Sequence, residues 1–139
     1  MEKRPVDMEK LMAFLSGDKF AQACGIVIDE VEEGRSRCSM KVTPMHINGW
    51  GAVMGGAVFS LADYAFAAAV NVGHTCYGEP LTVSRDINIT FLRPAKGDKL
   101  VAEAVIEHSG RTACFARVDV YDQRGKTVAV ATVNGAKAG

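Results

Sequence analysis

The feature that most constrains this sequence is a long apolar run that contains a single charged residue. The run extends from Gly55 to Gly73, and Asp63 lies near its middle. It is barely long enough to cross a bilayer, and an aspartate inside it makes a membrane span unfavourable. A helix that is apolar on nearly every side has to be enclosed, because a surface helix needs only one apolar stripe. We therefore expect a buried helix here, covered by the rest of the chain.

The segments around this helix show the two-residue periodicity of β-strands. Residues 26–34 and 35–43 are typical of a hairpin that turns at Glu33 and Gly34. In its second strand, four residues alternate with more polar ones; they are Ser36, Cys38, Met40 and Val42. Four more strands are expected at residues 81–92, 99–110, 111–122 and 126–136. Short connections at residues 93–98 and 109–110 favour antiparallel pairing of the strands that they join.

The N-terminal residues 1–25 are expected to form a helical segment outside the strand pattern. Asp7 can cap a short helix over Met8 to Ser16, and Gly17 can end it. The 139 residues contain no repeat, linker or low-complexity stretch, which predicts a single domain over residues 1–139. The order of elements predicts an α+β fold in which an antiparallel sheet is wrapped around one long central helix.

Charge and composition exclude several classes of partner. The chain has 16 basic and 16 acidic side chains, so it has no net field to attract nucleic acid or an anionic membrane. The sequence has no Gly-rich phosphate loop, nucleic-acid motif or metal-ligand cluster. We therefore expect no metal site, no nucleic-acid partner and no membrane partner.

The four cysteines are expected to be free thiols. Cys24, Cys38, Cys76 and Cys114 are far apart, and none belongs to a Cys-x-x-Cys pair. Small buried thiols of this kind fit a reducing compartment. Residues 1–20 mix acidic with basic side chains and lack the unbroken apolar stretch of a signal peptide. The expected location is the cytoplasm.

Two stretches carry a resemblance to a known family. Residues 46–71 read HINGWGAVMGGAVFSLADYAFAAAVN, and residues 84–98 read SRDINITFLRPAKGD. They resemble the hotdog-fold thioesterases of the phenylacetate-pathway (PaaI-like) type, and the resemblance extends from Ile26 to Gly135. It implies a hotdog fold, hydrolysis of aryl or small to medium acyl-CoA thioesters, and no metal or redox cofactor. It also implies a homodimer as the active unit and a homotetramer built as a dimer of dimers.

Gly55 and Gly56 open the expected helix, where backbone N–H groups lack intrahelical partners and face the positive end of the helix dipole. A thioester carbonyl becomes an oxyanion in the transition state, and such a donor stabilises it. Glycine also lets a substrate approach closely. Gly55 is therefore the oxyanion-hole candidate, and Gly56 a substrate-binding candidate. The alternative is that the two glycines only allow the loop to pack closely on the sheet.

Asp63 needs a partner or a use, because burying an unpaired carboxylate is costly. It can act as general base for water or as nucleophile on the thioester carbon. Eight helical residues rise about 12 Å, so Asp63 cannot reach a carbonyl held at Gly55 of its own helix. In a two-fold dimer with antiparallel helices, Asp63 of one chain would lie near Gly55 of the other. The alternative is a structural aspartate bonded by Ser60 or by a backbone group.

The resemblance also gives roles to residues outside the helix. Asn48 falls where relatives place an amide that positions water or the thioester; the alternative is a loop cap before Gly49. Ser84 occupies a strand position that relatives use to hold the catalytic carboxylate or its water, or it is a satisfied core hydroxyl. Many relatives carry histidine where this chain has Met54, which cannot donate a proton. His46, in the same loop, is either its substitute or a solvent-exposed histidine.

Three basic residues near strand ends are candidates for the phosphates of coenzyme A. They are Arg93 and Lys96 in the 93–98 connection, and Arg111 after Gly110. A guanidinium or ammonium at a strand end can meet a phosphate without losing its hydration. Each of them taken alone is more typical of a solvated turn charge. Together with His46 and Met54 they complete the predicted binding set.

Two other function classes remain open from the sequence. The chain could bind acyl-CoA without hydrolysing it, and the departure at Met54 allows this. A hydratase of the same fold needs an Asp-His pair, and no histidine follows Asp63 within the helix. The alanines at 65 and 67–69 leave room for an aryl or medium acyl group, although alanines also simply permit close packing.

Overall fold

The computed structural model describes residues 7–72 and 81–137 of the chain. The helices are α1 (Met8–Leu15), α2 (Lys19–Cys24), the 3-10 turn η1 (Pro44–His46) and α3 (Gly55–Asn71). The strands are β1 (Ile26–Glu32), β2 (Arg35–Lys41), β3 (Thr82–Phe91), β4 (Lys99–Ser109), β5 (Ala113–Tyr121) and β6 (Thr127–Lys137). Within these residues, no helix is both long enough and apolar enough to cross a membrane.

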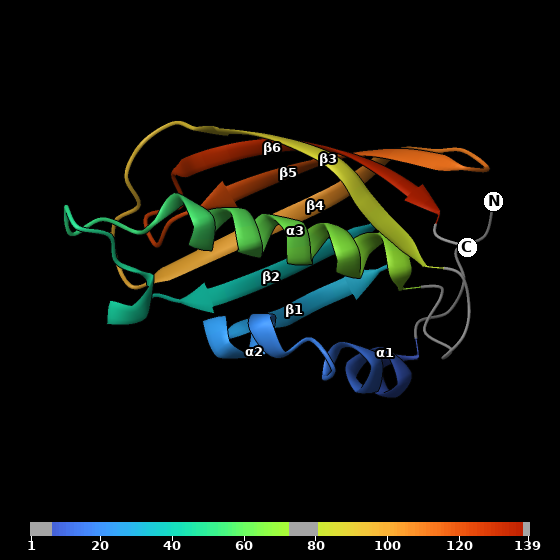
Figure 1. Ribbon diagram of the computed structural model, residues 1–139, viewed down its shortest axis with the longest axis horizontal. Coiled ribbons are helices and arrows are strands. Elements are labelled where there is room, and N and C mark those ends of the chain that lie inside the picture. Colours follow the sequence, from blue (N-terminus) through green and yellow to red (C-terminus); the bar gives the residue numbers. More distant parts are fainter. Residues whose placement is uncertain (1–6, 73–80, 138–139) are drawn as a thin grey trace.

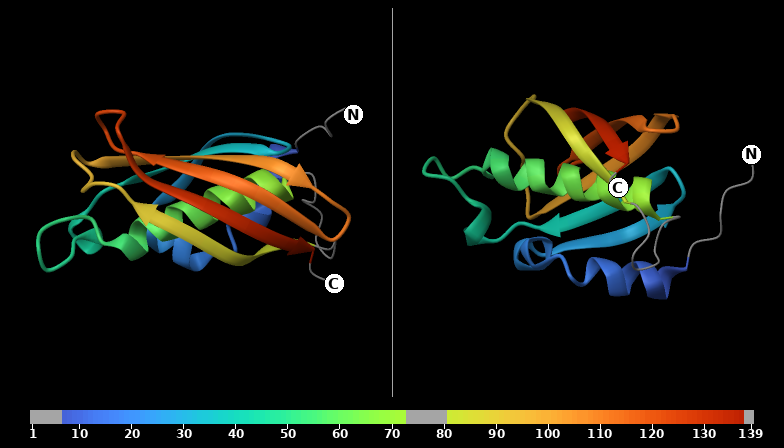
Figure 2. Two further views of the ribbon diagram at one scale, coloured as in Figure 1. Left: turned by 90° about the horizontal axis from the view of Figure 1, so that it is seen from above. Right: turned by 45° about the vertical axis from the view of Figure 1, so that its right-hand side comes forward.

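The strands form one antiparallel sheet that curls around α3. Its order in the described chain is β1-β2-β4-β5-β6-β3, and every neighbouring pair is antiparallel. Helices α1 and α2 lie along the β1 edge (Figure 1). Figure 2 shows β3, β5 and β6 arching over one side of α3, with β1 and β2 along the other. The α+β fold predicted from the sequence is confirmed.

The central helix packs on the sheet mainly through alanines, together with Val58, Leu61 and Phe66. Ala62, Ala65 and Ala68 are fully buried, and Phe66 is nearly so. The sheet supplies the other side of the core, including Cys38, Met40, Leu100, Val118 and Val133. A Cβ atom built on Gly135 would lie 2.8 Å from Phe66 Cζ, so the ring of Phe66 can cross β6 only where that strand has a glycine.

One stripe of α3 is left open by the described chain. Phe59 is exposed, and Asp63, Ala67 and Val70 are half-buried at the spacing of one helix face. Next to this stripe runs β3, an edge strand that, among the described strands, pairs only with β6 on its other side. The enclosure predicted for the apolar helix is therefore confirmed over most of its surface, and a partly apolar stripe remains beside a sheet edge.

The expected pairing of the two strands joined by residues 93–98 is wrong. β3 pairs with β6, whereas β4 pairs with β2 and β5. Six extended residues reach about 20 Å, and three strand spacings need only about 14 Å. A connection of this length can therefore pass two strands, and it does not fix which strands are neighbours. The connection at residues 109–110 does join antiparallel neighbours, as expected.

The N-terminal segment contains one more helix than the sequence indicated. The helix predicted over Met8 to Ser16 ends at Leu15, and Asp7 accepts a hydrogen bond from the Lys10 N–H at 3.1 Å. Asp18 caps α2 in the same way, with its carboxylate accepting from the Ala21 N–H at 3.1 Å. An aspartate three residues before a free N–H is a capping signal that could have revealed α2.

The described cysteines are free thiols, as expected. Cys24, Cys38 and Cys114 are buried and unpaired by disulfides, and Cys76 lies outside the described residues. Burial raises the pKa of the Cys38 thiol to about 12. Because the thiolate is the reactive form, Cys38 is a core residue rather than a nucleophile.

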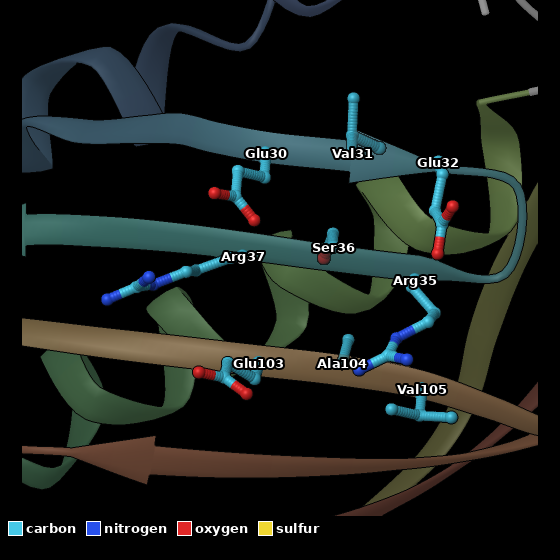
Figure 3. Close-up of a pocket in the computed structure, with 9 residues that line it drawn as sticks. All are labelled: Glu30, Val31, Glu32, Arg35, Ser36, Arg37, Glu103, Ala104 and Val105. Carbon is cyan, nitrogen blue, oxygen red and sulfur yellow. The ribbon is translucent and has the colours of Figure 1, made fainter.

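The outer face of the sheet carries alternating charges. Figure 3 shows Arg37 between Glu30 and Glu103, which belong to the neighbouring strands β1 and β4. Glu32 and Arg35 form the next opposed pair along β1 and β2. Opposite charges at facing strand positions stabilise each other. This face is a charge-balanced surface, and the candidate site residues on α3 lie on the other side of the sheet.

Candidate active site

Asp63 and Ser84 meet where α3 passes the start of β3. Ser84 Oγ donates a hydrogen bond to Asp63 Oδ1 at 3.1 Å. Ser60 instead donates to the Gly56 carbonyl at 2.8 Å, one turn back along its own helix. The alternative in which the Ser60 hydroxyl donates a hydrogen bond to Asp63 is therefore wrong. The Asp63 carboxylate instead accepts its hydrogen bond from Ser84 on β3.

The surroundings of Asp63 favour its protonated form. Burial raises the pKa of Asp63 above the usual aspartate range, and the hydrogen bond from Ser84 lowers it. The negative charge of Asp18 raises the pKa of Asp63 further. A carboxylate with a raised pKa is a better proton acceptor than a fully hydrated one. In the described residues, no group of three His, Cys, Asp or Glu side chains is placed to hold a metal ion.

A cavity of about 500 Å³ opens beside Asp63 and Ser84. It lies between α3, the start of β3 and the turn that joins α1 to α2. Its other lining residues are Leu15, Gly17, Asp18, Phe66, Ala67, Asn71, Leu81, Thr82 and Val83. The lining is mostly apolar with a few polar groups, which suits the acyl part of a ligand. The sequence pattern did not predict that Leu15, Gly17 and Asp18 line this cavity, because it did not indicate α2, the helix that Asp18 caps.

The start of α3 presents two free backbone donors. The Met54 carbonyl accepts from the N–H groups of Ala57 and Val58 at 3.0 and 3.3 Å. The N–H groups of Gly55 and Gly56 have no acceptor among the described residues. A Cβ atom on Gly55 would lie 3.1 Å from Phe91 Cζ, whereas one on Gly56 would meet nothing within 4 Å. Gly55 therefore allows close packing on Phe91 as well as presenting a donor.

Gly55 opens into a second cavity of about 470 Å³, which Asp63 does not line. Phe91, Arg93 and Ala95 form part of its wall, and the other lining residues are Ala52, Val53, Val58, Leu92, Pro94 and Val128. Eight helical residues separate Gly55 from Asp63, a rise of about 12 Å. One chain therefore does not bring the donor and the carboxylate together.

The Asn48 side chain closes the loop before α3. Its Oδ1 accepts hydrogen bonds from the backbone N–H groups of Trp50 and Ala52, at 2.9 and 3.1 Å. This is the loop-capping arrangement that the sequence left open as the alternative role. The side chain is half-buried, and its amide nitrogen is left to contact a ligand or water.

His46 is neither a solvent-exposed side chain nor a free proton donor. It is 3% exposed, and its Nδ1 lies 2.9 Å from the Thr43 N–H donor. Its Nε2 lies 2.8 Å from the Cys24 carbonyl oxygen, which assigns the proton to Nε2. The expectation that His46 contacts substrate is wrong, because both ring nitrogens tie this loop to the end of α2. Met54, in contrast, is 57% exposed at the helix start.

The three basic candidates do not form one cluster within a chain. Arg93 lines the cavity at Gly55, and Lys96 follows it in the same connection, where its backbone N–H donates to Asp122. Arg111 follows the opposite end of β4, and the eleven residues of that strand extend over about 35 Å. The expectation of a single cluster is therefore wrong for one chain, because β4 separates its members.

Comparison with known proteins assigns the chain to one family. A family model described as the thioesterase superfamily matches residues 51–129, which include Gly55, Asp63 and Ser84. The acyl-coenzyme A thioesterase PaaI of Escherichia coli (strain K12) is 38% identical over 120 residues, covering 85% of this chain and 81% of that protein. Acyl-coenzyme A thioesterase 13 of Homo sapiens is 33% identical over 124 residues, covering 87% and 86%. The solved structure of the E. coli PaaI protein from the phenylacetic acid degradation operon has a TM-score of 0.86 at 34% identity, covering 95% of this chain and 93% of that chain.

Proposed function

The chain belongs to the thioesterase superfamily, and from that premise we propose that it hydrolyses acyl-coenzyme A thioesters to a free acid and coenzyme A. The resemblance to hotdog-fold thioesterases of the phenylacetate-pathway type, predicted from residues 46–71 and 84–98, is confirmed. One observation carries the proposal. It is Asp63, a half-buried carboxylate held by Ser84 on the wall of a largely apolar cavity.

The proposed chemistry uses Asp63 on one face of the thioester and a backbone donor on the other. Asp63 takes a proton from water as the water oxygen bonds to the thioester carbon, and the carbonyl electron pair moves to its oxygen. The Gly55 N–H stabilises this oxyanion. Collapse of the tetrahedral intermediate breaks the carbon–sulfur bond and releases the thiolate of coenzyme A. If Asp63 is instead the nucleophile, its carboxylate bonds to the thioester carbon, the coenzyme A thiolate leaves, and an acyl–Asp63 anhydride forms. Water then hydrolyses this anhydride to the free acid and the Asp63 carboxylate.

The methionine at position 54 is compatible with this chemistry. A thiol has a pKa of about 8.5, so a thiolate leaves near neutral pH with little help from a general acid. The histidine that many relatives carry at this position is therefore not required for breaking the carbon–sulfur bond. Met54, exposed at the helix start, would instead line the approach to Gly55.

A second copy of the chain is needed to complete the site. Ser84 lies beside Asp63 at the start of β3, and Phe91 packs on Gly55 at its end. If the free edge of β3 pairs with the same strand of a second copy in antiparallel fashion, Ser84 of one chain faces the Phe91 end of the other. The carboxylate of one chain then meets the Gly55 donor of its partner, in two equivalent sites.

Two features of the single chain support this dimer. Among the described residues no strand pairs with the outer edge of β3, and natural proteins cover or pair such edges. The stripe of α3 with Phe59, Asp63, Ala67 and Val70 lies beside that edge and gains cover from the partner.

The same arrangement brings the separated basic groups to one site. Thr112 accepts from the Lys137 N–H, and Lys137 faces Thr82 at the start of β3, so Arg111 belongs to the Asp63 end of the sheet. Arg111 of one chain and Arg93 and Lys96 of the other would then face the phosphates of one coenzyme A. We further propose that two such dimers form a tetramer and that the enzyme works in the cytoplasm, which the buried free thiols support.

Turnover of an acyl-CoA panel tests the proposal. The purified protein is expected to release thiol from short, medium or aryl acyl-CoA thioesters, followed with a thiol reagent. The rate should survive treatment with EDTA, because neither step uses a metal or redox cofactor. Binding of the thioesters without thiol release would favour the non-catalytic acyl-CoA-binding alternative. Loss of activity on chelation, restored by added metal, would contradict the cofactor-free mechanism.

Replacing Ser84 with alanine is expected to lower kcat about tenfold, the scale of one hydrogen bond to a charged group. The Ser84 hydrogen bond lowers the pKa of Asp63, so its removal raises that pKa. The acidic limb of kcat/KM against pH should therefore move to higher pH. Ser60→Ala is the matched control, because Ser60 bonds the Gly56 carbonyl instead. If the acidic limb of the Ser84→Ala profile stays at the wild-type pH, the result would contradict the role of Ser84 in setting the pKa of Asp63.

A further inference from the structure

The cavity beside Asp63 has a second carboxylate on its wall. Asp18 lines it from the turn between α1 and α2, next to Leu15 and Gly17. On the α3 and β3 sides the lining contains apolar side chains, including Phe66 and Val83, beside the polar groups already described. An acyl group placed with its carbonyl at Asp63 and its tail in this cavity therefore lies alongside the Asp18 charge.

The position of the Asp18 carboxylate is fixed by the backbone around it. Its Oδ1 accepts from the Ala21 N–H at 3.1 Å, and its own N–H donates to the Leu15 carbonyl at 2.9 Å. The neighbouring cation, Lys19, directs its ammonium to the Ser16 carbonyl at 3.4 Å. The charge of Asp18 also acts across the cavity, since it contributes to the raised pKa of Asp63. The cavity that Asp63 lines therefore also holds a fixed negative charge on its wall.

We propose that Asp18 selects substrates by charge, so that the enzyme accepts neutral and cationic acyl groups and discriminates against acyl groups that end in a carboxylate. The inference rests on the proposed thioesterase function and assigns its substrate class. Like charges repel more strongly beside an apolar wall than in open water. The exposed Asp18 carboxylate can therefore repel a carboxylate at the end of an acyl group in this cavity.

Asp18 also lies outside the part of the chain that matches the family model. That match covers residues 51–129, which contain Gly55, Asp63 and Ser84, whereas Asp18 and Leu15 precede it. The hydrolytic groups thus belong to the segment common to the superfamily. The charge on the cavity wall comes from the N-terminal segment, outside that match.

Three substrates of matched length test the inference in the intact protein. They are adipoyl-CoA, its neutral methyl ester, and 6-(trimethylammonio)hexanoyl-CoA. Wild type is compared with Asp18→Asn, which removes the charge and keeps a good helix cap, because asparagine caps as well as aspartate. Asp7→Asn is the matched control, since Asp7 caps α1 through Lys10 and does not line the cavity.

Asp18→Asn is expected to raise the kcat/KM ratio of the anionic to the neutral substrate by about fivefold at low ionic strength, and less at high salt. The ratio of the cationic to the neutral substrate should fall. Asp7→Asn should leave both ratios at the wild-type values. Ratios that do not move in Asp18→Asn, or that move equally in Asp7→Asn, would overturn the inference while wild-type turnover still upholds the thioesterase function. If wild type hydrolyses none of the three, the same ratios are taken from their dissociation constants, so the inference is tested separately from the thioesterase function.

Discussion

Replacing Asp63 with alanine is expected to lower kcat/KM for acyl-CoA hydrolysis by at least about a hundredfold, a loss of roughly 3 kcal/mol of transition-state stabilisation. The substitution removes the only carboxylate that is both hydrogen-bonded by Ser84 and placed on the α3 wall of the cavity among the residues described. The fold should persist, because Asp63 lies on the open stripe of α3 and is not a member of its hydrophobic core. Thiol release and circular dichroism measure the two effects.

Asp63→Asn separates the chemical role from the packing. The amide has the same shape but cannot act as base or nucleophile, so activity should fall as far as with alanine. The raised pKa of Asp63 means that the folded chain holds this proton more tightly than the unfolded chain. The wild type therefore loses stability as pH rises from the ordinary aspartate pKa through the folded one, and the asparagine variant does not. Asp63→Asn should melt at a higher temperature than wild type at pH 7, and this difference should shrink in acid. Near-native activity in Asp63→Asn would show that Asp63 has a structural role and is neither the base nor the nucleophile.

Mixing two inactive variants is expected to restore activity if each site is built from two chains. One variant carries Asp63→Ala and the other carries Gly55→Val, which fills the space at the helix start. Each homodimer then has two dead sites. In a mixed dimer, one site combines both substitutions, and the other combines an intact Gly55 with an intact Asp63. After unfolding and refolding at equal amounts, random pairing should give about one quarter of wild-type activity.

The valine at position 55 needs its own control. Its Cβ would lie 3.1 Å from Phe91 Cζ, so part of its effect could come from displacement of that ring. The smaller Gly55→Ala variant, and the dimer content of each protein by sedimentation, show whether assembly survives. Mixed dimers that form in the expected amount but stay inactive would rule out the shared site.

Periodicity predicted the elements of the fold but not all of their neighbours. The start of α3 at Gly55 and the strand segments follow from local patterns, which depend on the residues next to one another. The pairing of β3 with β6 depends on the curvature of the whole sheet, so the length of the 93–98 connection could not reveal it. Local patterns give no information on such distant contacts.

The residues of the candidate site also fall into those that local sequence could predict and those that depend on distant contacts. The glycine donors and the buried aspartate could be argued from helix chemistry, and the resemblance supplied Ser84. The burial of His46 could not be foreseen, because it depends on the Cys24 carbonyl at the end of α2, a helix that the sequence pattern did not indicate. The same omission concealed Asp18, whose place on the cavity wall follows from the turn before that helix.

The separate cavities at Gly55 and Asp63 have a consequence for when the enzyme works. If hydrolysis needs one cavity from each of two chains, a newly made single chain is inert toward acyl-CoA, however complete its own fold. The amount of working catalyst then follows mass action and rises with the square of subunit concentration wherever monomers prevail. A cell that holds little of the protein would keep its acyl-CoA pool largely untouched, and modest increases in expression would start hydrolysis steeply.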